Sequence, residues 1–567
     1  MRIDRLRVNN FRNLADLDLR LEPSAVIVGE NRSGKSNLVH ALRLVLDPAL
    51  SKFDRYLGRS DFWDGLSDGS DDWDPMASGE VIEISVEIVD FEDDAKLMVA
   101  LSDALVQESE ARARLTYRFA PMDTGTDTGP VKYRPTIFGG DNEDQLISSD
   151  LRGYLYMAFL HALRDAETDL ASWHRSPLRT LLEAAAKSIE ESDLGVVREA
   201  MKEANAKIND LSEIKNVGAD IAARVLEIVG DNQALETELA VAPDDPLRLI
   251  RNMKLYVDGS AHRHLGSTSL GTLNVLYLAL LELGLEQRLR DADIAHVVMA
   301  IEEPEAHLHP HMQRLVFKRL LTEAPQTRTA LVTTQSPHIA SVASPRSLVL
   351  LRTVNGQTAA AAAHQADLSP QEWDDLARYL DATRAELVFA RRVLLVEGYA
   401  EQVLVPQLAR SCGMDLDKLG ITVCSVSGTH FGTYVAFCEA LEIPWAVLTD
   451  GDGGAGANRA ANLVQRIRKS GPPADHGIFV GGTTFEHDVV LADSANVGPF
   501  FDTLRELGSA SVADAINGWG GSAPSCDELI SVIGKVGGKG RFAQRVALHK
   551  LVPAAHVRDA LEYLAAQ

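Results

Sequence analysis

Cysteine is scarce in this sequence, and its few positions are far apart. The 567 residues include four cysteines, Cys412, Cys424, Cys438 and Cys526. A zinc knuckle or a CxxC redox pair needs closely spaced cysteines, so the spacing excludes both. We expect free, reduced thiols of the kind found in cytoplasmic proteins.

Positive charge is also scarce. The formal net charge is −25, with 81 acidic residues against 56 lysines and arginines. Because like charges repel, such a chain does not coat nucleic acid through a bulk positive potential. Any contact with DNA must be local, through short basic clusters or through divalent cations held between acidic side chains and phosphates.

Long apolar runs are absent as well. Residues 1–7 lack the apolar stretch of a secretion signal, and runs such as 275–281 are too short to span a bilayer. We therefore expect a soluble, cytoplasmic protein without membrane contact. The composition is that of an ordinary globular protein, and since a domain takes roughly 100 to 200 residues, the length predicts about three or four domains.

The amino-terminal segment contains a phosphate-binding loop. The loop Gly29-Glu30-Asn31-Arg32-Ser33-Gly34-Lys35-Ser36 follows an apolar strand and precedes an amphipathic helix, which is the context that G-x-x-x-x-G-K-[ST] requires. Backbone N–H groups of such a loop surround the phosphates of ATP, Lys35 reaches the β and γ phosphates, and Ser36 binds Mg²⁺. The predicted nucleotide-binding residues here are Gly29, Asn31, Ser33, Gly34, Lys35, Ser36 and Asn37.

A later apolar strand ends in two carboxylates, Glu302 and Glu303. Glu302 should help to hold Mg²⁺ beside the nucleotide, directly or through water, and Glu303 should be the base that polarises the attacking water. Paired carboxylates at a strand end are often only a solvated turn. After a phosphate loop, the catalytic interpretation is favoured.

A second α/β pattern starts near residue 386 and has its own acidic residues. One apolar strand leads to Glu397, with Glu401 on the following helix, and another leads to Asp450 and Asp452. Oxygen-rich clusters bind hard cations such as Mg²⁺ or Mn²⁺. If the two strand ends are adjacent, these carboxylates converge on a metal site.

Between these two regions, residues 176–239 form a helical pattern rich in Ala, Glu, Leu and Lys. Two interpretations stay open, a bundle packed within one subunit and an arm that pairs two subunits. A segment of small residues, 265–271, follows and precedes an apolar helix.

The order of these motifs, with Glu-Glu-Pro-Glu-Ala-His-Leu-His-Pro at 302–310, resembles the ABC-type ATPases related to RecF and SMC proteins. The resemblance implies a dimer in which Ser267 or Ser269 of one subunit lies near the γ phosphate bound to the other. That family usually has Thr-His-Ser-Pro where this chain has Thr-Gln-Ser-Pro, so Gln335 replaces the switch histidine. Glutamine donates a hydrogen bond but carries no charge, so we expect slow hydrolysis, or a nearby residue such as His338 in its place.

The acidic residues of the second region resemble the Toprim domain of topoisomerases, primases and nucleases. With the later motifs at 484–488 and 537–543, the chain resembles the OLD (overcoming lysogenization defect) family of nucleases, which includes the nuclease subunit of Gabija antiphage systems. The resemblance implies DNA cleavage by a two-metal mechanism.

The resemblance assigns Glu397, Asp450 and Asp452 to one metal and Glu401 and Glu486 to the second, with Asp488 a weaker candidate. It also implies that Lys539 neutralises charge on the phosphate in the transition state. The expected catalytic residues are Glu303, Lys539, Glu397 and Asp450. Local DNA contacts would come from two basic clusters, Arg466, Arg468 and Lys469, and Lys535, Lys539, Arg541, Arg545 and Lys550.

The expected fold class is α/β multidomain. A RecF/SMC-like ABC ATPase domain would occupy residues 1–170 and 246–385, with a helical dimerisation insertion at 171–245 and a Toprim α/β domain at 386–567. We expect an ATP-regulated, metal-dependent DNA endonuclease or nickase, a homodimer or dimer-based oligomer that acts in antiphage defence or DNA repair, with a helicase or other defence protein as a further partner. The alternative is a non-cutting, RecF-like DNA clamp; a primase or topoisomerase is disfavoured because neither a zinc ribbon nor an active-site tyrosine context is present.

Overall fold

The computed structural model describes the chain except for residues 71, 107–110, 123–130, 162–165, 174, 175, 230–244, 258–262, 324–326, 382, 383, 521–523, 534, 535 and 537. The chain folds into two compact units. The first comprises Met1–Ala162 and His296–Gln567, and the second is Leu163–Ala295. The domain bounds predicted from the sequence stay a prediction.

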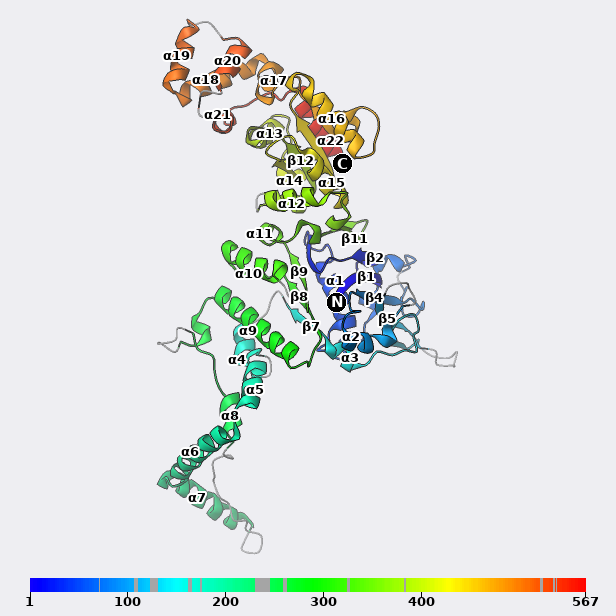
Figure 1. Cartoon of the computed structure of the whole chain (residues 1–567), viewed down its shortest axis with the longest axis vertical. Coiled ribbons are helices and arrows are strands. Elements are labelled where there is room, and N and C mark those ends of the chain that lie inside the picture. The colour runs from blue at the N-terminus through cyan, green and yellow to red at the C-terminus, as the bar shows by residue number, and fades with distance from the viewer. Residues whose placement is uncertain are drawn as a thin grey trace. The chain divides into compact units, whose positions relative to one another are not determined.

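A six-stranded sheet in the first unit carries the phosphate loop, and its order is β11-β10-β3-β9-β8-β7. Figure 1 labels four of these strands, β7, β8, β9 and β11. All neighbouring strands are parallel except β10 and β11. Every residue of β8 is buried, as in a sheet covered on both faces. The strands are β3 (Ser24–Gly29), β7 (Leu155–Leu160), β8 (His296–Glu302), β9 (Arg328–Thr334), β10 (Leu348–Val354) and β11 (Gln357–Ala362).

Several helices lie between the strands of this part of the chain, and one follows the last of them. Helix α1 follows the phosphate loop directly, so the predicted order of strand, loop and helix is confirmed. The helices of this part are α1 (Lys35–Leu46), α2 (Ala95–Ala100), α3 (Ser149–Tyr154), α10 (Pro310–Thr322), α11 (Pro337–Ala340) and α12 (Pro370–Tyr379).

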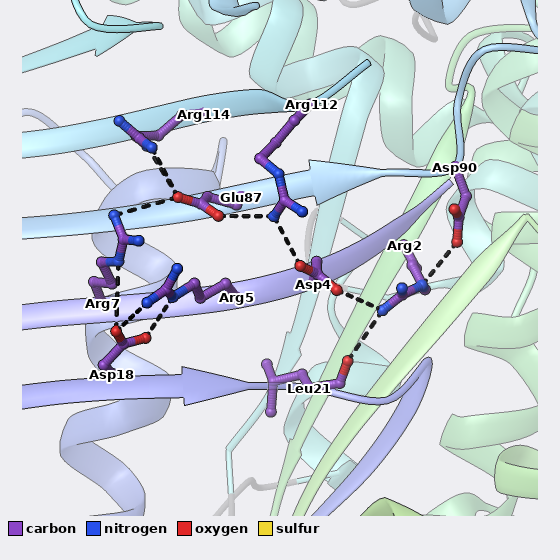
Figure 2. Close-up of polar contacts among 10 residues, drawn as sticks. All are labelled: Arg2, Asp4, Arg5, Arg7, Asp18, Leu21, Glu87, Asp90, Arg112 and Arg114. Carbon is purple, nitrogen blue, oxygen red and sulfur yellow. Dashed lines mark hydrogen bonds and ion pairs between the residues drawn. The ribbon is translucent and has the colours of Figure 1, made fainter. Parts of the chain in front are cut away.

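A five-stranded antiparallel sheet, in the order β2-β1-β4-β5-β6, adjoins this part of the chain. Its alternating pattern buries apolar side chains on one face and leaves arginines and carboxylates on the other, where Figure 2 shows them linked in a chain of ion pairs. The strands are β1 (Arg2–Phe11), β2 (Leu14–Arg20), β4 (Ile82–Val89), β5 (Ala113–Pro121) and β6 (Tyr133–Gly139).

The centre of that network is Glu87, whose side chain is 2 % exposed. Its two carboxylate oxygens each accept a hydrogen bond at 2.9 Å, one from Arg112 and one from Arg114, and Arg7 lies 3.4 Å away. Arg112 also contacts Asp4 at 2.8 Å. One buried carboxylate therefore organises several arginines.

The carboxy-terminal part of the first unit has a four-stranded parallel sheet of order β13-β12-β14-β15. Its apolar core joins strand residues such as Leu394 and Leu448 to helix residues such as Leu404 and Leu561. The strands are β12 (Arg392–Val396), β13 (Ile421–Ser425), β14 (Trp445–Thr449) and β15 (Ile478–Val480). The helices are α13 (Tyr399–Ser411), α14 (Leu416–Leu419), α15 (Phe431–Ala440), α16 (Ala455–Arg466), α17 (Phe485–Ala492), α18 (Val497–Leu507), α19 (Ala510–Gly518), α20 (Cys526–Ile533), α21 (Lys539–Val546) and α22 (Ala555–Ala566).

The second unit is mainly helical where it is described. Its small apolar cluster includes Leu170, Leu265, Leu273 and Leu280. The predicted helical pattern over 176–239 agrees with the structure up to the end of α7, and residues 230–239 lie outside the described residues. The helices are α4 (Ala166–Ala171), α5 (Leu178–Ser188), α6 (Glu191–Asn209), α7 (Ser212–Val229), α8 (Pro246–Arg251) and α9 (Leu270–Arg290). Among all described helices, none has the length and apolar character needed to cross a membrane.

We predict that Glu87→Ala lowers the free energy of unfolding by about 3 kcal/mol, because removing one partner of a buried ion pair leaves the other charges uncompensated. Chemical denaturation of the purified protein measures the change. Glu83→Ala is the matched control on the same strand: its carboxylate is 42 % exposed and 3.9 Å from Arg118. An equal loss in both variants would contradict the role given to Glu87.

Candidate functional site

The shape of the phosphate loop depends on glycine at position 34. Gly34 has a φ of +100°, and a Cβ there would lie 2.5 Å from the Thr358 hydroxyl oxygen. That hydroxyl donates a hydrogen bond of 2.9 Å to the Ser33 carbonyl. Strand β11 therefore supports the loop from outside and leaves room for no side chain at position 34.

Lys35 lies inside the loop. Its Nζ donates to the carbonyl oxygens of Gly29 at 2.8 Å and Glu30 at 2.9 Å, and the side chain is buried. Burial lowers the pKa of Lys35, while the carboxylates of Glu303 and Glu305 act in the opposite direction. The ammonium group is thus held where loops of this kind bind the β and γ phosphates.

The metal side of the nucleotide site is formed by Ser36 and Glu302. Burial raises the pKa of the buried Glu302 carboxylate, and the nearby Ser36 hydroxyl acts in the opposite direction. The ring of His161 lies 4.0 Å from the same carboxylate. A loop hydroxyl beside a strand-end carboxylate is the pair that binds Mg²⁺ with a nucleotide in phosphate-loop enzymes.

Gln335 connects the two sides of the site. Its Nε2 donates to Asn31 Oδ1 at 2.8 Å and to Glu303 Oε1 at 2.6 Å. Its backbone N–H donates at 2.7 Å to Glu305, which also accepts a 2.9 Å bond from the Thr334 hydroxyl. Gln335 therefore orients Glu303, the expected base, and an acid that the sequence had not singled out, Glu305, orients Gln335.

Asn37 contacts other side chains rather than the loop. Its amide nitrogen donates to Asn13 at 2.6 Å, and its oxygen accepts from Arg12 at 2.9 Å. Arg12 also donates to Asp61 at 2.9 Å. Asn37 thereby fixes α1 against β1 and the loop that follows it, and a direct role at the nucleotide stays a prediction.

Ser267 and Ser269 belong to the second unit. Ser269 caps α9 by accepting a hydrogen bond from the Thr272 N–H at 3.3 Å, and Ser267 lies in a short 3-10 turn before it. The segment is therefore the start of a helix, as small residues before an apolar helical pattern predict. Its role at a partner's nucleotide stays a prediction.

The second group of predicted residues meets at the ends of β12 and β14. These strands are parallel neighbours, with Val396 opposite Leu448, so Glu397 and Asp450 follow them side by side. Glu397 Oε1 accepts hydrogen bonds from the Asp450 N–H at 2.9 Å and from the Thr449 hydroxyl. The sequence pattern predicted this adjacency.

Asp450 stands at the centre of a negative cluster. Burial, followed by the carboxylates of Glu397, Glu401, Glu486 and Asp452, raises the pKa of Asp450 to about 7. Negative charges gathered in this way disfavour one another's ionisation unless a cation joins them. The cluster therefore has the electrostatic character of a cation site.

Glu486 and Lys539 form the far side of this cluster. Glu486 is 3 % exposed, and its Oε2 accepts a 3.0 Å bond from Lys539 Nζ. Its other oxygen, Oε1, is buried and has no hydrogen-bond partner among the described residues. A buried carboxylate oxygen without a partner is costly, and a divalent cation would satisfy it. The donor set therefore fits Mg²⁺ or Mn²⁺.

Glu401 and Asp488 have partners on the backbone. Glu401 is buried and accepts a 3.0 Å bond from the Gly398 N–H, and burial raises its pKa. Asp488 accepts from the N–H groups of Gly482 at 2.7 Å and Thr483 at 3.0 Å. Asp488 thus holds a loop, which explains its residue type without a metal.

Arg459, which the sequence pattern had not singled out, lies among the acids. Its Nη2 is 3.1 Å from Glu397 Oε1 and 3.0 Å from Asp452 Oδ2. Over the described residues, no three side chains of His, Cys, Asp or Glu are gathered as a ready metal site. Arg459 and Lys539 instead accompany the acids. The sequence signal that could have identified Arg459 is a basic residue on the helix that directly follows the Asp-x-Asp turn.

Two family models match the chain. "AAA domain, putative AbiEii toxin, Type IV TA system" matches residues 24–341, more than half of the chain, and "Overcoming lysogenization defect protein-like, TOPRIM domain" matches residues 388–452. The first contains the phosphate loop and β8, and the second contains Glu397 and Asp450. The chain belongs to the OLD family. The predicted α/β fold class, an ATPase domain followed by a Toprim domain, is confirmed. A protein with these two domains uses a nucleotide and a divalent metal.

Named relatives of this OLD-family chain cover most of its length. It is 26 % identical over 465 residues to the OLD nuclease of Thermus scotoductus, covering 79 % of this chain and 82 % of the relative. It is 22 % identical over 488 residues to the endonuclease GajA of Bacillus cereus, and the match covers 82 % of this chain and 79 % of the relative. A solved structure, the C-terminal region of the Burkholderia pseudomallei OLD protein, matches at 32 % identity over 31 % of this chain and 97 % of that chain, with a TM-score of 0.27.

For the ATPase domain of this OLD-family protein, we predict that Glu303→Gln keeps nucleotide binding and slows hydrolysis about 100-fold or more, because the amide cannot accept a proton from water. A fluorescent-nucleotide titration and a phosphate-release assay separate the two effects. Glu323→Gln, an exposed change on the surface, is the control. If Glu303→Gln hydrolyses ATP at the wild-type rate, a residue other than Glu303 is the base.

Proposed function

We propose that this OLD-family protein is a divalent-metal-dependent DNA endonuclease or nickase, controlled by its ATPase domain and used in defence against phage. The observation that carries the proposal is the cluster around Asp450, where several carboxylates, a buried unpartnered oxygen of Glu486 and the ammonium of Lys539 occupy one edge of the Toprim sheet. Relatives named as nuclease and endonuclease support it.

Glu397, Asp450 and Asp452 would hold one divalent cation, and Glu401 and Glu486 a second. Bound in this way, such cations activate water and stabilise the leaving oxygen of a phosphodiester.

The chain's own side chains supply the rest of the chemistry. Lys539 is 56 % exposed, so its ammonium can reach a phosphate while it remains beside Glu486. Hydrogen bonding and charge aimed at the phosphate stabilise the developing negative charge.

Local basic residues would hold the DNA. In the first predicted cluster, Arg466 pairs with Glu372 at 2.7 Å and Arg468 with Asp367 at 2.9 Å, so part of its charge is neutralised. In the second cluster, Lys535 lies outside the described residues. Arg541 and Arg545 are exposed one helical turn apart on α21, which begins at Lys539. We favour this face of α21 as the phosphate contact.

Control by nucleotide is supported by a link between the phosphate loop and the Toprim sheet. The Glu30 carboxylate accepts two bonds from Arg391, at 2.6 and 3.0 Å. Arg391 immediately precedes β12, which ends at Glu397. Lys35 also holds the Glu30 carbonyl, so a nucleotide that draws Lys35 to its phosphates changes the environment of Glu30.

We also infer a dimer-based assembly. Helices α6 and α7 carry apolar side chains on their surface, including Val196 at 72 % exposure and Ile228 at 74 %. Exposed apolar groups in this number mark a surface that pairs with another protein, and Ser267 and Ser269 would complete a partner's nucleotide site.

The nuclease proposal is tested on supercoiled plasmid with Mg²⁺ or Mn²⁺. We expect wild type to nick the plasmid and Asp450→Ala to be at least about 100-fold slower, since it removes the central metal ligand. Asp502→Ala, an exposed change in the same part of the chain, should nick as wild type does. No nicking by wild type with either metal would reject the nuclease and favour a non-cutting clamp.

The control proposal is tested by the same assay with and without ATP. We expect ATP to change the nicking rate of wild type about fivefold or more and to have no effect on Lys35→Ala. Arg391→Gln should bind ATP normally and respond less, whereas Arg378→Gln, an exposed change on α12, should respond fully. If Lys35→Ala responds to ATP as wild type does, the phosphate loop does not control the nuclease.

A further inference from the structure

We propose that Arg459 is an exchanging counter-cation: it holds Glu397 and Asp452 in the metal-free protein, leaves them when a divalent cation binds, and then contacts a phosphate of the DNA. The inference rests on the proposed metal-dependent nuclease function. Arg459 thereby becomes a positioning residue in one state and a substrate contact in the other.

The position of one guanidinium nitrogen is the starting point. Arg459 Nη2 lies 3.1 Å from Glu397 Oε1, 3.0 Å from Asp452 Oδ2 and 2.8 Å from the Asp450 carbonyl oxygen. Its Nε donates at 3.1 Å to the Thr449 hydroxyl. The side chain is 19 % exposed. Two carboxylates and a carbonyl converging on one positive group are the oxygen set that a hard cation takes.

Arg459 and a metal ion cannot both use this position. Nη2 has two protons for three oxygens, so Arg459 satisfies the set only in part. Glu397 Oε1 already accepts bonds from Thr449, Asp450 and Arg459, and a cation at bonding distance would need the place of one of them. The Asp450 N–H is fixed by the backbone, whereas the guanidinium stands at the end of a flexible side chain. Repulsion between two positive charges then favours its departure.

A polar cavity gives the released guanidinium somewhere to go. Arg459 lines a space of about 490 Å³ together with Thr429, His430, Thr433, Asn462 and Arg466. Arg466 in that cavity is held by Glu372 at 2.7 Å. The lining also includes the carboxylate of Glu372, which is paired with Arg466, and the cavity meets the metal acids through Arg459. Its hydroxyls, amides and arginines suit a phosphodiester. Guanidinium forks bind phosphate oxygens in pairs.

The affinity of the protein for a divalent metal distinguishes this exchange from a purely structural role, in which Arg459 stays on the acids. If Arg459 stays on the acids when metal binds, removing it disorders the ligands and weakens metal binding. If it must leave, removing it deletes a competitor and a repelling charge, so metal binding becomes tighter. The two roles therefore predict changes of opposite sign.

The test uses the full chain without DNA and titrates Mn²⁺ by calorimetry, with free Mn²⁺ followed by electron paramagnetic resonance. We expect Arg459→Gln to bind Mn²⁺ about tenfold more tightly than wild type, and its metal-free Tm to be lower because two carboxylates lose their partner. Arg459→Lys should show the same changes to a smaller degree. It replaces the glutamine variant in the test if that variant does not fold. Arg410→Gln, an exposed change on α13, should match wild type.

The second measurement is DNA binding in Ca²⁺ by the same variants, using a duplex oligonucleotide. Arg459→Gln should bind DNA about tenfold more weakly despite its tighter metal, because one charged phosphate contact is lost. Unchanged or weaker Mn²⁺ binding, or unchanged DNA affinity, would overturn the exchange. Absence of any Mn²⁺ binding by wild type would instead overturn the metal-dependent nuclease itself, and this inference with it.

Discussion

Mutual repulsion of carboxylates is the constraint on which both chemical centres depend. Parallel strands bring their last residues to one edge, so β8 places two glutamates beside the phosphate loop, and β12 and β14 place Glu397 next to Asp450. Negative charges gathered inside a protein cost free energy unless cations accompany them. Lys35 accompanies the first group, and Arg459 and Lys539 accompany the second.

The same constraint explains how a chain with a net charge of −25 can handle anionic ligands. The cations at the two centres are buried or half-buried and already have partners, so they present little long-range field. Lys35 contacts backbone carbonyls, and Arg459 and Lys539 contact acids. A phosphate or a metal ion changes their partners instead. Binding at either centre is therefore an exchange of partners, in which the ligand replaces protein oxygens or protein charge.

Strand ends could be predicted from sequence because an apolar run of five or so residues followed by an acid needs only local information. Glu302, Glu397 and Asp450 lie where that pattern put them. The resemblance also placed Gln335 at the nucleotide site, but the hydrogen bonds between residues from different parts of the chain could not be predicted. Gln335 meets Asn31 across 304 positions of sequence, and this contact depends on β3 and β9 being neighbours, which no local pattern reveals.

Arg459 and Asn37 illustrate the other limit. Arg459 is close in sequence to Asp452, yet whether it turns toward the acids or toward solvent depends on the direction in which α16 leaves the Asp-x-Asp turn. Asn37 belongs to a phosphate-loop motif by position, but its partners Arg12 and Asn13 come from the turn between β1 and β2. The sequence motif to which a residue belongs therefore predicts where that residue lies better than it predicts its hydrogen-bond partners.

The link between the two centres acts through the backbone as well as through the pair of Glu30 and Arg391. That pair is largely exposed, with 54 % and 65 % of the side chains accessible, and an exposed ion pair alone contributes modestly. Arg352 adds bonds of 2.9 Å to the Ala390 carbonyl and 3.2 Å to the Glu442 carbonyl, from a strand whose Leu351 pairs with Gly29. Strand β10 therefore holds both segments that enter β12 and β14, so a shift of the phosphate loop against β10 reaches Glu397 and Asp450 together.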